Sequence, residues 1–145
     1  MKNIIKLAKE GKFVKVDFPH IKHVLMWETL SEWEGPKNDE YQINASVRKK
    51  IAVLEDMGFI PEIIDGGCFA CWADHTFASI NKIFHMNCHT TCPLKWTDKN
   101  GNPSDTCHDI YQAWVHASGE KKKRLARMIR DMPLKDEAEL LYNIK

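Results

Sequence analysis

Apolar residues recur at helical spacing through most of the chain. The clearest case is residues 106–118, where they follow the i, i+3, i+4 and i+7 spacing of one helix face, before a break at Gly119. The same spacing predicts helices at 3–10, 20–33, about 39–57, 120–131 and 135–142. The helix that ends before Gly58 is expected to bury Ile43, Val47, Ile51 and Leu54.

One short segment has the pattern of a β-strand instead. Between Lys12 and Phe18, apolar and charged residues alternate, as they do in a half-buried strand. A strand needs a partner, and we expect it in another short segment near the cysteines. The apolar positions of residues 76–86 fit a helix or a strand equally. These patterns predict a mainly α fold, that is, α+β with a minor β element, in a single domain over residues 1–145.

Four of the five cysteines form two close pairs in the middle of the chain. Cys68 and Cys71 have C-x2-C spacing, and Cys88 and Cys92 have C-x3-C spacing. Two tight turns that each carry two thiolates can supply the four ligands of a tetrahedral zinc ion. We therefore expect Zn²⁺ in a region of about residues 66–107, followed by C-terminal helices at about 106–132.

Other interpretations of the cysteine pairs stay open. The thiols can form disulfides or be buried as small apolar side chains. Because the second pair is looser than the usual C-x2-C, Cys107, His85 or His89 can replace one of its cysteines as a ligand. A closed four-thiolate shell leaves no position for water or substrate, so we expect the zinc to be structural rather than catalytic.

Length and charge limit the classes of protein that fit. The chain has 145 residues and a mass of 16.8 kDa, which is enough for one core and small enough to gain from a metal. Its formal net charge of +1 disfavours bulk nucleic-acid binding and excludes the acidic surface of a DNA mimic. No apolar run approaches the length of a membrane span, and the N-terminus has no signal-peptide core, so we expect a cytoplasmic protein.

Charge is nevertheless concentrated in two segments. Residues 120–131 have a local charge of +4 and residues 28–40 a local charge of −4, so the two can face each other across the fold or a dimer. We expect the basic side chains to point outward, as a solubilising face or as a contact for an acidic protein surface. Contacts to phosphates are the alternative, although no aromatic residue interleaves to stack on bases. The candidate contact residues are Lys121, Lys122, Arg124, Arg127 and Arg130.

No catalytic motif accompanies these features. The chain lacks a phosphate-binding glycine loop, a nucleophile elbow, an H-E-x-x-H motif and the zinc-deaminase signature. A metal nuclease built on His85 and His89 needs an open metal position, which a closed thiolate site does not leave. A nucleophilic Cys107 is less favoured than a buried thiol or a zinc ligand. We therefore expect no enzymatic activity.

A pair of histidines outside the cysteine region is a further candidate for metal binding. His20 and His23 lie three positions apart on a predicted helix and can share a metal ion. Because no third ligand is near them in the sequence, we expect both to be exposed.

Several short motifs together resemble a known family. They are Met26-Trp27, Cys68-Phe69-Ala70-Cys71-x-Ala73, Cys92-Pro93-Leu94-x-Trp96, Cys107, Tyr111-x-x-Trp114 and a basic helix that ends at Pro133. From about His20 to Pro133 the chain is similar to small zinc-knuckle proteins encoded by phages and prophages of Firmicutes. Family members commonly have C-x2-C in the second pair, so the resemblance makes Cys88 the least certain ligand and Cys107 its natural replacement.

Phages of this group carry compact proteins that disarm host defences, including metal-containing anti-CRISPR inhibitors of the single-protein type II nuclease. The resemblance therefore implies a non-enzymatic phage accessory protein that binds and inhibits a host protein, with a CRISPR nuclease as the expected target. It implies action in the cytoplasm of the infected bacterium. The family does not by itself fix a function, and the alternative is a small zinc-finger nucleic-acid-binding protein that uses residues 121–130.

Overall fold

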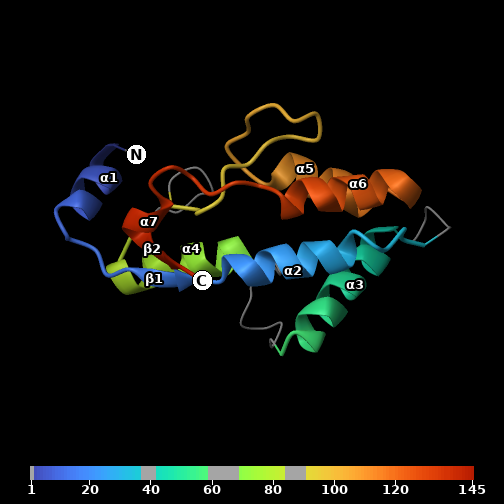
Figure 1. Ribbon diagram of the computed structural model, residues 1–145, viewed down its shortest axis with the longest axis horizontal. Helices are drawn as coiled ribbons and strands as arrows, with labels where there is room; N and C mark the ends of the chain where they lie inside the picture. The colour runs from blue at the N-terminus through green and yellow to red at the C-terminus, as the bar shows by residue number, and fades with distance from the viewer. Residues whose placement is uncertain (1, 37–41, 59–68, 84–90) are drawn as a thin grey trace.

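The computed structural model describes residues 2–36, 42–58, 69–83 and 91–145, and it is mainly helical (Figure 1). The helices are α1 (Lys2–Lys9), α2 (His20–Leu30), α3 (Gln42–Asp56), α4 (Phe69–Asn81), α5 (His108–His116), α6 (Gly119–Arg130) and α7 (Ala138–Leu141). The strands are β1 (Val16–Phe18) and β2 (Tyr142–Ile144). The predicted mainly α fold with a minor β element is confirmed, and the start predicted near Asp39 lies outside the described residues. None of the helices in these ranges is both long and apolar enough to cross a membrane.

β1 pairs in parallel with β2, which brings two distant parts of the chain together. Val16 lies opposite Tyr142 and Phe18 opposite Ile144, and the amide of Lys145 donates to the Phe18 carbonyl oxygen at 2.9 Å. The prediction of a partner strand near the cysteines is therefore wrong. The three residues of β2 show no alternation of apolar and charged side chains in the sequence, so this strand becomes visible only through its pairing with β1.

α2 and α6 pack along each other and run antiparallel (Figure 1). Beyond the end of α2, the Gly119 amide at the start of α6 donates to the Glu34 carbonyl oxygen at 2.8 Å. Near the start of α2, the His23 ring contacts the Ile129 carbonyl close to the end of α6. Lys123 also forms an ion pair with Glu34 at 3.5 Å. In the described part of the acidic segment, Glu34 therefore faces the basic helix within the fold, which is one of the two arrangements that the charge pattern allows.

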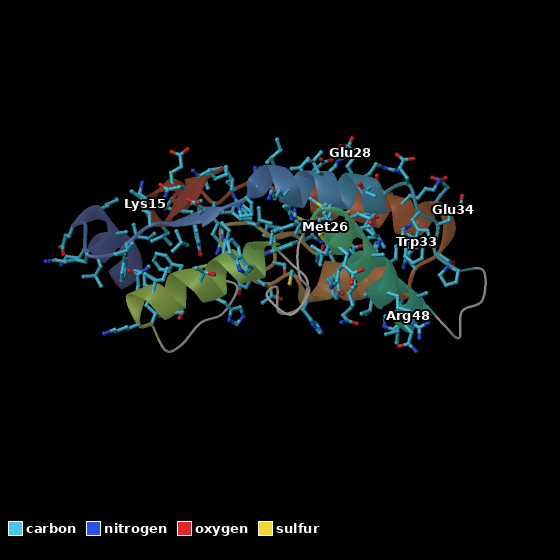
Figure 2. The ribbon with its side chains drawn as sticks, turned by 90° about the horizontal axis from the view of Figure 1, so that it is seen from below. Lys15, Met26, Glu28, Trp33, Glu34 and Arg48 are labelled. Atoms are coloured by element: carbon cyan, nitrogen blue, oxygen red, sulfur yellow. The ribbon has the colours of Figure 1, made fainter. Side chains whose placement is uncertain are left out.

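A cluster of buried apolar side chains extends from β1 through the helices to β2. Near its middle, Trp27 of α2 and Trp114 of α5 pack edge to face, with ring centroids 5.0 Å apart. Met26 points from α2 into this interior, whereas Glu28 points away from it (Figure 2). The tryptophans of the long periodic segments are therefore central to the core.

α3 buries only part of the face that its sequence predicts. Leu54 is buried as predicted and Ile51 is half-buried, whereas Ile43 and Val47 are 52% and 38% exposed. Ser46 and Lys50 are buried in the first half of the helix instead. Because the polar groups of Ser46 and Lys50 have partners on neighbouring helices, hydrogen bonds contribute to the rotation of α3 together with the apolar contacts of Leu54.

Candidate functional site

The predicted zinc ligands lie only partly within the described residues. Cys71 is half-buried on α4, Cys92 is 2% exposed, and Cys107 is half-buried at the start of α5. Outside the described residues lie Cys68, Cys88, His85 and His89. In the part of the chain that is described, no group of three or more His, Cys, Asp or Glu side chains is arranged to hold a metal ion. Zinc and its ligands therefore stay a prediction.

The surroundings of Cys92 suit a metal-binding thiolate. The indole Nε1–H of Trp96 donates to the Cys92 sulfur at 3.4 Å, and both side chains are buried. Side chains that bind a metal commonly have such a hydrogen-bond partner behind them, which fixes their orientation. The donor therefore fits the prediction that Cys92 is a ligand, and it gives Trp96 a role in the Cys-Pro-Leu-x-Trp motif.

Two buried hydrogen bonds hold Thr91, which precedes Cys92, against α4 and β2. The Thr91 hydroxyl donates to the Asp74 carboxylate, and the Tyr142 hydroxyl donates to the Thr91 carbonyl oxygen. All three residues are buried. Asp74 stands one helical turn after Cys71, and Cys92 follows Thr91 directly. The network therefore holds the Cys92 segment against α4, the helix that carries Cys71.

Electrostatics keep the Tyr142 hydroxyl protonated in this network. Burial raises the pKa of the Tyr142 phenol far above its ordinary value, and the nearby Asp74 and Cys92 raise it further. The phenol therefore stays a hydrogen-bond donor. No signal in the sequence links Tyr142 with Thr91, which lies 51 positions earlier.

The basic helix α6 keeps four of its five predicted contact residues at least partly at the surface. They are Lys121, Arg124, Arg127 and Arg130. The three arginines line a shallow pocket of about 370 Å³ together with Thr97. Arg130 also donates two hydrogen bonds to Asp131, at 2.8 and 3.0 Å. This pairing raises the pKa of Arg130 and lowers the pKa of Asp131.

The fifth residue, Lys122, points into the fold, so the prediction that it faces outward is wrong. Its side chain is fully buried, and its ammonium group donates to the Ser46 hydroxyl at 2.7 Å. It lies 4.5 Å from the ring centroid of Trp114 and 5.2 Å from that of Trp33. It also donates to carbonyl oxygens at the end of α5, those of Trp114 at 2.6 Å, Ala117 at 3.1 Å and Val115 at 3.3 Å.

These contacts make Lys122 part of the fold rather than of a partner surface. The last turn of a helix leaves carbonyl groups without intrahelical donors, and the ammonium group both supplies donors and complements the helix dipole. Burial lowers the pKa of Lys122 to about 8. Because basic residues surround Lys122 in the sequence, the charge pattern gives no sign of this role.

His20 and His23 also differ from the prediction that both are exposed. His23 is fully buried and His20 is half-buried, and their rings stack with centroids 6.1 Å apart. His23 Nε2 donates to the Ile129 carbonyl oxygen at 2.9 Å. Burial lowers the pKa of His23 to about 4, so the ring is neutral at pH 7. His23 therefore joins α2 to α6.

α2 exposes two apolar side chains on one face, which we name the α2 strip (Ile21 and Leu25). These residues stand four positions apart and are 59% and 48% exposed. Glu28 continues the same face, and its charge acts on Arg130 of α6. Exposed apolar side chains bordered by charges of both signs are typical of a protein-contact surface.

No protein-family model, curated protein or solved structure matches the chain in comparisons with known proteins. The resemblance to phage zinc-knuckle proteins therefore stays a prediction from the motif residues.

Proposed function

We propose that the protein is a non-enzymatic accessory protein that acts by binding another protein. The observation that supports this most directly is the α2 strip, where Ile21 and Leu25 are exposed beside Glu28. Covering exposed apolar surface contributes about 25 cal/mol per Å² to association before the costs of binding. The charge of Glu28 beside the strip supplies orientation and specificity.

The motif resemblance extends the proposal to the kind of partner. The resemblance favours a host protein as the partner, and we propose a type II CRISPR nuclease as this target. Binding would block the use of target DNA by the nuclease. Zinc is structural in this proposal, because four thiolate ligands leave it no open position for chemistry. The place of action is the cytoplasm of the infected bacterium.

A second candidate is nucleic-acid binding through α6. The observation that favours it is the pocket lined by Arg124, Arg127 and Arg130, because guanidinium groups bind phosphate well. Two findings weigh against it. Lys122 is buried, and Arg130 is already paired with Asp131.

A pull-down from host lysate tests the proposal. Tagged, zinc-loaded protein is used with and without nuclease digestion, beside Ile21→Glu and the matched variant Ile80→Glu, whose side chain is 51% exposed on α4. We expect wild type and Ile80→Glu to retain one dominant host protein after digestion, and Ile21→Glu to lose it. Capture that disappears with the nucleic acid would overturn protein binding and favour the α6 candidate.

The proposed target is tested separately with a purified type II nuclease and its guide RNA. We expect an equimolar amount of wild-type protein to inhibit cleavage of target DNA, and Ile21→Glu to inhibit it much less. Undiminished cleavage would remove this nuclease as the target, and the pull-down would still decide whether the partner is a protein.

A further inference from the structure

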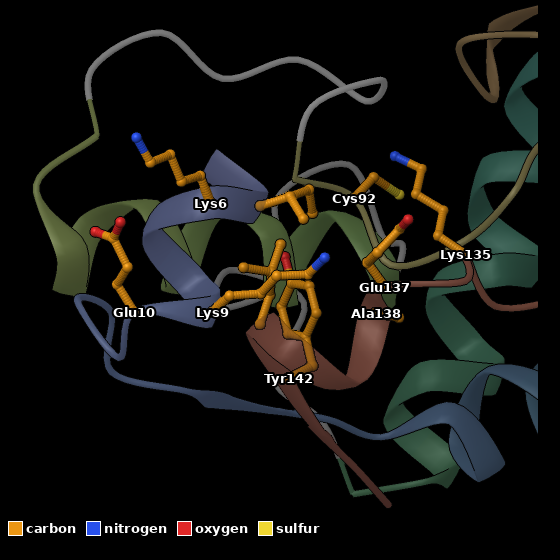
Figure 3. Close-up of a pocket in the computed structure, with 10 residues that line it drawn as sticks. Lys6, Lys9, Glu10, Cys92, Lys135, Glu137, Ala138 and Tyr142 are labelled. Carbon is orange, nitrogen blue, oxygen red and sulfur yellow. The ribbon is translucent and has the colours of Figure 1, made fainter. Parts of the chain in front are cut away.

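A pocket of about 640 Å³ opens between α1 and the C-terminal segment α7–β2 (Figure 3). Its volume falls within the range of about 300–1,000 Å³ that is common for small-molecule sites. None of its lining residues belongs to the α2 strip or to the arginine pocket of α6. The apolar part of its wall comes from Ile5, Ala138, Leu141 and Tyr142.

Lysine side chains supply positive charge to this pocket. Lys6 and Lys9 come from the last turn of α1. Lys9 extends across the pocket from α1, whereas the ammonium group of Lys6 and the carboxylate of Glu10 point away from it (Figure 3). Within the part of the chain that the structure describes, neither Lys6 nor Lys9 forms an ion pair. On the opposite wall Lys135 and Glu137 balance each other in charge, so the α1 side gives the pocket its positive character.

The polar groups deeper in the wall are already engaged. The Tyr142 hydroxyl donates to the Thr91 carbonyl oxygen, so the tyrosine offers the pocket its ring. The sulfur of Cys92, which also lines the pocket, accepts the indole N–H of Trp96. The recognition elements that remain among the lining residues are apolar surface and lysine ammonium groups, which suit binding of a ligand with an apolar part and a negative charge.

We propose that this pocket binds a small organic anion with an apolar body, of the acyl- or aryl-carboxylate class. The apolar body lies against Ile5, Leu141 and the Tyr142 ring, and the anionic group lies beside Lys9. Because α1 packs chiefly on α7, a ligand between them also holds the N-terminal helix to the C-terminal segment. This inference does not depend on the protein partner proposed above.

A fluorescence titration of the zinc-loaded full chain with 8-anilinonaphthalene-1-sulfonate, an aryl anion that brightens in apolar sites, tests the proposal. We expect saturable binding of one molecule per chain. We also expect decanoate to displace the dye, and decanol, which has the same chain length but no charge, to displace it far less. Absence of saturable binding would overturn the proposal, as would equal displacement by decanol and decanoate.

Variants locate the binding in this pocket. Lys9→Glu should raise the dissociation constant about tenfold or more, because it replaces attraction of the anion by repulsion. Lys9→Arg keeps the charge and should stay within about twofold of wild type, as should Lys15→Glu, an exposed lysine outside the pocket. Ile5→Ser should weaken binding through the apolar wall. Equal affinity in wild type and Lys9→Glu, with unchanged near-ultraviolet circular dichroism, would overturn the assignment.

The same variants separate this inference from the proposed function. Lys9→Glu should still retain the host protein in the pull-down, because Lys9 lies outside the α2 strip. Ile21→Glu should bind the dye as wild type does. Loss of both properties in Lys9→Glu would show that the pocket is part of the partner surface and would overturn its assignment as a separate ligand site.

Discussion

The ammonium nitrogen of Lys122 lies 2.6 Å from the carbonyl oxygen of Trp114, at a fully buried side chain. One side chain thus joins three helices, because it belongs to α6, caps the end of α5 and donates to Ser46 of α3. The rings of Trp33 and Trp114 lie next to the ammonium group, where their π faces favour a cation. A lysine in the middle of a basic helix is therefore a structural contact of the core.

We predict that Lys122→Met lowers the free energy of unfolding by about 2–4 kcal/mol. Methionine fills a similar volume but donates no hydrogen bond, so the carbonyl groups at the end of α5 lose this donor. Urea unfolding followed by tryptophan fluorescence measures the change. Lys121→Met, at the exposed neighbouring position, should change stability by less than about 0.5 kcal/mol. Equal stability of the two variants would show that the fold does not need the ammonium contacts.

α2, α5 and α6 are predictable because each carries its own apolar stripe, and they begin and end within a few residues of the bounds that the spacing predicts. The helical state of α4 was not predictable, because the apolar positions of residues 76–86 fit a helix or a strand equally. β2 was not predictable, because its three residues carry no periodic signal and its partner comes from the other end of the chain. The rotation of α3 was not predictable either, because it depends on polar partners of Ser46 and Lys50 that only the folded chain supplies.

The candidate metal site stays a prediction from the sequence. The spacing of the cysteine pairs favours zinc, and the Trp96 donor to Cys92 agrees with the motif that contains both residues. The network of Asp74, Thr91 and Tyr142, in contrast, has no signal in the sequence. Each of these residues is ordinary in the sequence, and only packing shows that all three are buried together.

We predict that acid destabilises the fold through His23. Burial holds the pKa of His23 at about 4 in the folded protein, below the value of 6.5 for an exposed histidine. Between these two pH values the unfolded chain binds the proton and the folded chain does not. The free energy of unfolding therefore falls as the pH falls from 6.5 to about 4, by about 3 kcal/mol from this residue.

Urea unfolding at a series of pH values through this window measures the effect. His23→Gln cannot titrate, so its stability should depend less on pH than that of wild type. His116→Gln, at an exposed position, should keep the wild-type dependence. If the free energy of unfolding changed with pH by the same amount in wild type and His23→Gln, the prediction would be contradicted. Carboxylates and metal ligands contribute equally to this change in all three proteins.

We predict that Cys71→Ser lowers the zinc content and the melting temperature together. Zinc bound by thiolates contributes its binding free energy to folding, so loss of one ligand weakens both. Metal analysis by mass spectrometry and thermal unfolding measure the two quantities on the same sample. A chelator should melt the region of residues 59–106 in the wild-type protein, and unchanged zinc stoichiometry in Cys71→Ser would remove Cys71 from the site.

The identity of the fourth ligand follows from the same measurements on two further variants. Cys88→Ser and Cys107→Ser should differ, because only one of the two thiolates completes a four-ligand shell with Cys68, Cys71 and Cys92. If a variant keeps one zinc ion per chain, the cysteine that was replaced in it is not a ligand. If a variant loses the zinc ion, the replaced cysteine is the fourth ligand. Retention of zinc by both variants would point to a histidine, His85 or His89, in the fourth position.

We predict that reversing the charge at two arginine positions of α6 leaves binding of the host protein intact. Arg124→Glu with Arg127→Glu removes the positive charge of the α6 pocket and leaves the α2 strip untouched. Any affinity of wild type for labelled DNA should fall steeply between about 50 and 200 mM salt, because it depends on released counterions. The double variant should lose that affinity and still retain the host protein, with Lys95→Glu, an exposed lysine outside this pocket, as a control. Loss of the host protein in the double variant, but not in Lys95→Glu, would show that the partner binds α6. Unfolding would not explain this loss, because both substitutions lie on the surface of a helix whose core contacts include Leu125 and Ile129.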